Sequence, residues 1–238
     1  MVIPLGDERT GRDLTPYVVF GLIAVNALVW LLQLSLGDSF TNGYATVPFE
    51  ITHGQDLVGA QTITVGGQSI TIPEAPGPSP IYLTLLTAMF MHGGWLHILG
   101  NMLYLWIFGD QIESLLGHGR FLVFYLACGL AASLAQILVG PDSVVPSLGA
   151  SGAIAGVLGA YLVKFPRNRV RVLVARGGLT ELPAMVVLGL WIVLQLVSKV
   201  STPAVRPPGW RTWRTSAGSS QGWRWYSRSG GSGSRHSA

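Results

Sequence analysis

Hydrophobic residues gather in five stretches whose lengths approach or reach that of a membrane-spanning helix. An α-helix rises about 1.5 Å per residue, so about 20 mostly apolar residues cross the hydrocarbon core of a bilayer. The first stretch begins at Tyr17 and has Asn26 and Gln33 as its only strongly polar members. The pattern predicts an all-α polytopic membrane protein with five spans, at residues 17–36, 95–112, 121–139, 150–163 and 183–197.

The segment between the first two spans has a different pattern. Residues 37–80 are polar and rich in Gly and Pro. Within them, apolar and polar residues alternate between positions 62 and 72, which favours a β-hairpin. Residues 81–94 are apolar but end in a histidine and two glycines. We expect this last segment to lie in the membrane interface and not to cross.

Composition agrees with a membrane protein. Of the 238 residues, 49% are hydrophobic and only 11% are charged, whereas about 25% are charged in soluble domains. The chain has one cysteine, Cys128, in an apolar run. A disulfide framework and a cysteine-based metal site are therefore excluded.

The charge distribution sets the expected orientation and domain limits. Short cytoplasmic loops of membrane proteins are enriched in Lys and Arg. Residues 164–178 hold five basic residues and no acidic one, so we expect them in the cytoplasm with the N-terminus, and residues 37–80 outside. This divides the chain into a cytoplasmic segment at 1–16, a membrane domain at 17–198 and a tail at 199–238.

The tail differs from the rest of the chain. Eight of the 15 basic residues and all 11 acidic residues precede Lys199, so that part carries a net charge of −3. Seven basic and no acidic residues follow from Lys199 onward, which gives +7. This basic Ser/Gly/Trp-rich composition predicts disorder.

The fourth span begins with Gly149-Ala150-Ser151-Gly152. Glycines allow a sharp turn, and the free N–H groups at a helix N-terminus favour a developing anion. Ser151 is therefore a candidate nucleophile, although a cap or a small packing residue would read the same way. Gly152 and Gly156 are four residues apart, which gives a flat helix face for close packing in lipid.

The second span carries His97 and Asn101 near its start, and His92 lies three residues before it. His97 and Asn101 are four apart and therefore share a helix face. An imidazole N–H and an amide aimed at one point would stabilise an oxyanion. A metal site and an interhelical hydrogen-bond pair remain the alternatives. Further on, Glu113 and Arg120 flank a glycine turn, and we expect them to pair and tie that loop together.

Together these motifs resemble the rhomboid intramembrane serine proteases, in order and in position on the spans. The resemblance implies a six-helix core with a water-filled cavity that opens outward, and single-span membrane proteins as substrates. It also implies that Ser151 is the nucleophile, that His97 and Asn101 form the oxyanion site, and that four further residues support the site: His92, Gly149, Gly152 and Gly156.

The family's base is a histidine on a sixth span, and no such span follows Val200. His236 lies in the polar tail, and His53 and His118 lie in predicted loops. The tail resembles a coding sequence read in the wrong frame: starting at the third base of the Gly209 codon, permitted codons spell an apolar segment with Ala-His-x-Gly-Gly. The sequence thus predicts a rhomboid-like protein with five of six spans and its base histidine lost.

The function expected from this reading is intramembrane serine endopeptidase chemistry, weakened or lost in this chain. The alternatives are a catalytically inactive rhomboid-like protein that binds transmembrane clients, and a small transporter or channel. Without the sixth helix, we expect the face around Gly152 and Gly156 to meet lipid or a partner. The expected partners are transmembrane substrates and the bilayer, with no nucleic acid, cofactor or metal, and the expected location is a bacterial inner membrane.

Overall fold

The computed structural model describes residues 2–8, 14–65, 68–174 and 178–200. The predictions for the tail are the disorder, the reading-frame hypothesis and the position of His236. Apart from residues 199 and 200, the tail lies outside the described ranges. The described part belongs to one compact unit, Met1–Val205.

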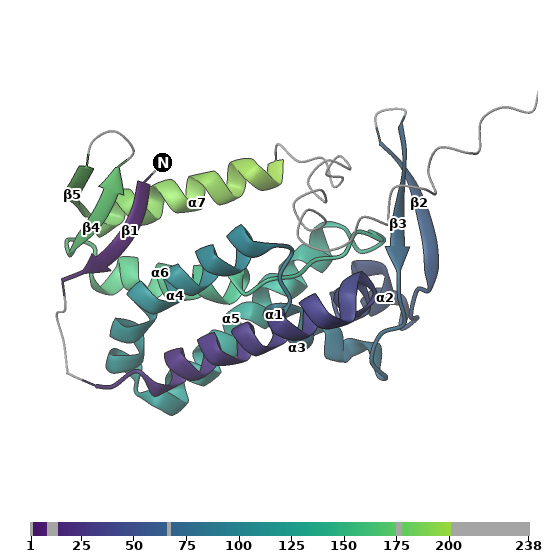
Figure 1. Cartoon of the computed structure of the whole chain (residues 1–238), viewed down its shortest axis with the longest axis horizontal. Helices are drawn as coiled ribbons and strands as arrows, with labels where there is room; N and C mark the ends of the chain where they lie inside the picture. The colour runs from purple at the N-terminus through teal and green to yellow at the C-terminus, as the bar shows by residue number, and fades with distance from the viewer. Residues whose placement is uncertain (1, 9–13, 66–67, 175–177, 201–238) are drawn as a thin grey trace, which may run out of the picture. The chain divides into compact units, whose positions relative to one another are not determined.

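The described chain is mostly helical, as predicted (Figure 1). A helix lies at each of the five predicted spans, with ends shifted by a few residues. These are α1 (Tyr17–Gly43), α4 (Trp95–Leu116), α5 (His118–Val139), α6 (Ser151–Lys164) and α7 (Ala184–Val200). Gly37, with φ of 81°, interrupts α1 at the end of the predicted span. Beyond this break the helix resumes and extends into the polar region, to Gly43.

By length and composition, α1 and α5 are able to cross a membrane. A third crossing results if α4 and the short helices before it, Ile81–Phe90, form one broken span. These two parts are bent by 77°. The location of residues 81–94 in the membrane interface stays a prediction. The apolar segments Ser151–Lys164 and Ala184–Val193 are shorter.

Four short helices lie in the first connection. They are α2 (Pro48–His53), η1 (Ile81–Leu83), α3 (Thr84–Thr87) and η2 (Ala88–Phe90). The predicted hairpin is confirmed as β2 (Gly59–Val65) and β3 (Gln68–Glu74), which pair antiparallel.

A three-stranded sheet was not predicted. Its order is β1 (Val2–Asp7), β4 (Arg169–Val174) and β5 (Gly178–Pro183), with both pairs antiparallel (Figure 1). The interpretation of 164–178 as a basic loop was therefore incomplete. Its Arg-Val-Arg-Val stretch alternates exposed and buried residues, the period-two pattern of a half-buried strand.

The core surrounds α6, which packs against α4, α5 and α7. Ala153, Ile154, Val157, Leu158 and Tyr161 are at most 1% exposed. The glycine face of α6 lies on α5: a Cβ atom at Gly152 would stand 2.5 Å from Cβ of Ala132, and one at Gly156 would collide with Cys128. The prediction of close packing on this face is confirmed, with α5 as the partner, and Gly156 also lines a groove beside α5. Any helix with a small-residue face fits a glycine groove, and α5 supplies one.

Glu113 joins α4 to the start of α1. Its carboxylate is fully buried and accepts the backbone N–H groups of Val18 at 2.9 Å and Val19 at 2.8 Å. His118 contacts the same carboxylate at 2.5 Å. The predicted structural role of Glu113 is supported, but Arg120 as its partner is wrong, since the carboxylate binds Val18, Val19 and His118 instead. The free N–H groups of a helix N-terminus are strong donors to a carboxylate.

Candidate active site

Ser151 is the first residue of α6 and is partly buried. The backbone turns into the helix at Gly149, where φ is 122°. Side chains rarely adopt this conformation, so the turn requires glycine. The N–H of Gly149 donates to the carbonyl of Ala88 at 2.8 Å, and Ala150 is fully buried. The start of α6 is thus fixed against the short helices that precede α4.

The side chains of His97 and Asn101 lie against this turn. A Cβ atom on Gly149 would stand 2.7 Å from both Cε1 and Nε2 of His97 and 3.8 Å from Nδ2 of Asn101. Only a glycine leaves room for the imidazole there. The predicted shared face of α4 is therefore present, and it lies beside the backbone two residues before Ser151.

His92 supports this pair from behind. It is fully buried, and its Nε2 accepts the Asn101 amide at 3.0 Å. Its Nδ1 lies 3.2 Å from the carbonyl of Phe90, which can only accept, so the ring proton is on Nδ1. The second N–H of the Asn101 amide remains available as a donor. Because Nε2 of His92 is already used, the arrangement favours hydrogen bonding over metal ligation.

Gln33 holds His92 in place, a role that its position in the sequence did not predict. Its Oε1 accepts the backbone N–H of His92 at 2.9 Å, and its Nε2 donates to the His92 carbonyl at 3.0 Å. The same Nε2 also donates to Thr41 Oγ1 at 2.9 Å. The signal was a polar residue inside an otherwise apolar span, because such residues usually face the protein interior.

The orientation of His97 follows from its contact with Gly93. The Gly93 N–H donates to Nδ1 of His97 at 3.3 Å. A ring nitrogen that accepts has no proton, so neutral His97 carries its hydrogen on Nε2. That is the nitrogen that lies against Gly149. His97 Nε2–H and the free Asn101 N–H are therefore two neutral donors beside the N-terminus of α6.

The other described histidines have different surroundings. His53 on α2 is stacked on Phe49 and lies 3.0 Å from Thr52 Oγ1. His118 contacts Glu113 and begins α5, 14 residues before the level where α5 meets Gly152. At about 1.5 Å per residue, His118 is therefore roughly 21 Å along α5 from the level of Gly152, too far to act as a base for Ser151.

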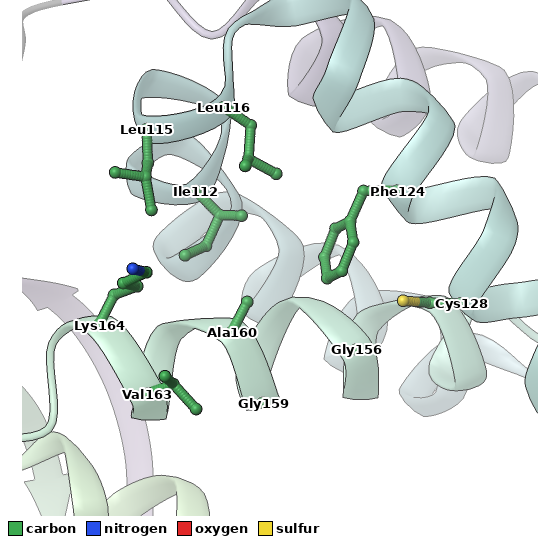
Figure 2. A pocket seen from close by; sticks show the side chains of 10 residues that line it. All are labelled: Ile112, Leu115, Leu116, Phe124, Cys128, Gly156, Gly159, Ala160, Val163 and Lys164. Atoms are coloured by element: carbon green, nitrogen blue, oxygen red, sulfur yellow. The ribbon is translucent and has the colours of Figure 1, made fainter.

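One cavity of about 380 Å³ lies away from this site (Figure 2). On α6 its lining residues lie between Gly156 and Lys164 and do not include Ser151. The outward-opening cavity at Ser151 therefore remains a prediction.

Comparison with known proteins adds independent information. A sequence model of the Rhomboid domain matches residues 80–207, which is more than half of the chain. The matched region contains α4, α5 and α6 and every predicted site residue, whereas Gln33 lies outside it.

Three relatives illustrate the similarity. Rhomboid protease GluP of Bacillus subtilis is 46% identical over 85 residues, which is 36% of this chain and 16% of the relative. RHOMBOID-like protein 5 of Arabidopsis thaliana is 37% identical over 84 residues, 35% of this chain and 27% of the relative. The mitochondrial presenilin-associated rhomboid-like protein of Homo sapiens is 33% identical over 100 residues, 41% of this chain and 26% of the relative. The matches thus span about a sixth to a quarter of these relatives.

Proposed function

This chain belongs to the rhomboid family, and from that premise we propose that it is built as an intramembrane serine endopeptidase with Ser151 as its nucleophile. It is a multi-pass membrane protein, and we propose single-span membrane proteins as its substrates. We further propose a bacterial inner membrane as its location, with the N-terminus in the cytoplasm.

The observation that carries the proposal is the contact between Gly149 and the pair on α4. His97 Nε2 and Asn101 Nδ2 would stand within 4 Å of a Cβ at Gly149, two residues before the proposed nucleophile. Preorganised donors at the point where negative charge develops usually supply the largest share of catalysis in acyl transfer. Neutral N–H donors suit this role, because they stabilise an anion without losing their own proton.

The proposed reaction has two stages. The Ser151 hydroxyl attacks the scissile carbonyl carbon and gives its proton to a base, while His97 and Asn101 donate to the carbonyl oxygen as it becomes negative. The amine leaves with that proton, and water then hydrolyses the acyl-enzyme. Without a base, a serine hydroxyl is a poor nucleophile. We propose that this base is the histidine lost with the sixth span, which makes the present chain nearly inactive.

A fluorophosphonate probe on the purified full chain tests the proposal. We expect slow labelling at Ser151 and none in Ser151→Ala. A chain whose residues from 209 onward follow the alternative reading frame should label far faster, because removing the base lowers the rate by on the order of 10⁶-fold in soluble serine proteases. In that chain, Asn101→Ala should lower peptide cleavage by about 10²- to 10³-fold, the usual loss for one oxyanion donor.

Two outcomes would overturn parts of this proposal. Equally fast labelling of both chains would show that the base is not missing. No labelling of Ser151 in either chain would remove the protease interpretation. The second result would favour the alternative of an inactive protein that binds transmembrane clients.

A further inference from the structure

An apolar groove lies between α4, α5 and α6 at the end of α6 away from Ser151 (Figure 2). Its volume of about 380 Å³ is within the range of small-molecule sites, about 300–1,000 Å³. Aliphatic and aromatic side chains, a thiol and two glycines form its wall, and Lys164 contributes the only charge. The Lys164 side chain stands at one end of the group of lining residues in Figure 2.

Two rows of residues line the groove and end in cations. On α5, Phe124 and Cys128 line it, and Arg120 lies one turn earlier on the same face. On α6, the lining residues Gly156, Ala160 and Lys164 are again four apart. Each row thus runs from an apolar interior to a basic side chain.

The two cations lie at the same level of the membrane domain. The near-contact of Gly156 with Cys128, and of Gly152 with Ala132, shows that α5 and α6 run antiparallel. Eight residues beyond the Gly156–Cys128 level, α6 reaches Lys164 and α5 reaches Arg120. Both side chains are exposed.

No acidic residue lines the groove: among the acids near this end, Asp7 accepts hydrogen bonds from Tyr161 and Gln111, and Glu8 accepts the N–H of Arg169. The acidic residues of α4 are Asp110 and Glu113, and the described α5 and α6 contain none. Neither acid lines the groove, and the Glu113 carboxylate is buried among the N–H groups of α1 and His118. The positive N-terminal end of the α5 helix also lies here and favours an anion.

We propose that this groove binds one anionic phospholipid of the leaflet on the side of Lys164, with an acyl chain in the groove and the phosphate between Lys164 and Arg120. Bilayer lipids are as apolar as the groove, so an acyl chain alone gains little by entering. The selectivity therefore comes from the headgroup charge. The site does not involve Ser151 and is independent of the proposed protease activity.

Native mass spectrometry of the full chain, purified from nanodiscs with equal phosphatidylglycerol and phosphatidylcholine, tests the proposal. We expect the chain to retain one phosphatidylglycerol in preference to phosphatidylcholine. Gly159→Leu should abolish this retention, because the added side chain enters open space in the groove and meets no atom within 4 Å at its Cβ. Lys164→Gln should lower it roughly fivefold, the usual effect of one basic residue near an anionic surface.

Matched controls separate a defined site from general attraction. Gly21→Leu makes the same change at an exposed glycine of α1, also with nothing within 4 Å. Arg167→Gln removes an exposed cation just beyond α6 that does not line the groove. Both should retain the lipid as the unaltered chain does. Thermal unfolding of each variant checks its fold, and Lys164→Gln, at an exposed position, leaves the core intact.

Three results would overturn the proposal. One is equal retention of the two lipids. Another is unchanged phosphatidylglycerol in Gly159→Leu, which would place the lipid on the surface. The third is a dimer that disappears in Gly159→Leu while bound lipid persists, which would make a second copy of the chain the occupant.

Discussion

Replacing Glu113 with alanine should destabilise the membrane domain strongly, because this carboxylate accepts the backbone N–H groups at the start of α1. The side chain is fully buried and accepts two backbone N–H groups of α1, at 2.9 Å from Val18 and 2.8 Å from Val19. In Glu113→Ala both donors lose their partner. Free N–H groups at a buried helix end are costly, because no water replaces the lost acceptor.

The magnitude follows from the exposure of the two donors. A hydrogen bond to a charged group contributes about 1.5–3 kcal/mol, and an unsatisfied buried donor costs a similar amount. Val19 is fully buried, so its full penalty applies, whereas the partly exposed Val18 is able to bind water. We therefore expect the free energy of unfolding to fall by about 3 kcal/mol. His118, whose side chain is 39% exposed, should contribute about 1 kcal/mol or less.

Unfolding in mixed micelles with increasing SDS, followed by tryptophan fluorescence, measures these differences. Glu113→Gln keeps the side-chain volume and one acceptor oxygen, so it should fall between the native chain and Glu113→Ala. Glu181→Ala, on β5, removes a half-exposed carboxylate as a control. If Glu113→Ala and Glu181→Ala change stability equally, or if His118→Ala alone reproduces the loss, the capping argument is wrong.

Three further predictions concern other parts of the structure. Gly152→Ala should lower the unfolding free energy by about 1–3 kcal/mol, because its Cβ would stand 2.5 Å from a methyl group of α5. Gly159→Ala adds a methyl group in open space, so it should be neutral or stabilising in the same SDS titration. Gly149→Ala should lower the thermal unfolding midpoint, since φ is 122° and the new Cβ would stand 2.7 Å from the His97 ring; an unchanged midpoint would contradict this. Burial, and then the nearby carboxylates of Glu50 and Asp56, raise the pKa of Glu74 from 4.5 to about 8. Between pH 4.5 and 8 the folded carboxyl therefore keeps its proton, whereas the unfolded one has lost it. The stability of the β2–β3 hairpin should fall as pH rises through this range, by at most about 1.4 kcal/mol per pH unit. Hydrogen exchange of β3 amides should show this slope, and Glu74→Gln should remove it.

Much of the fold could be read from local pattern. The apolar stretches predicted all five long helices, because segment length and composition alone decide whether a helix suits a bilayer. Alternation between residues 62 and 72 predicted the hairpin. The i, i+4 spacing of His97 and Asn101 likewise placed both on one helix face.

Other features needed the tertiary structure. Glu113 was expected to meet Arg120 nearby in sequence, yet it binds the start of α1, about 95 residues away. The strand β4 was hidden in a basic loop, because its partner β1 lies at the opposite end of the described chain. Gln33 was visible as a polar residue, but its bond to His92 was not.

The sequence by itself determined where the five long helices lie, which face of α4 carries the candidate chemistry and how little charge the chain carries. The tertiary structure decided which faces meet: the glycine face of α6 with α5, and Gly149 with His97 and Asn101. The reason is physical. Helix length and periodicity arise from interactions within a few residues, whereas a glycine groove accepts any closely fitting surface, so its partner depends on how all the helices pack together.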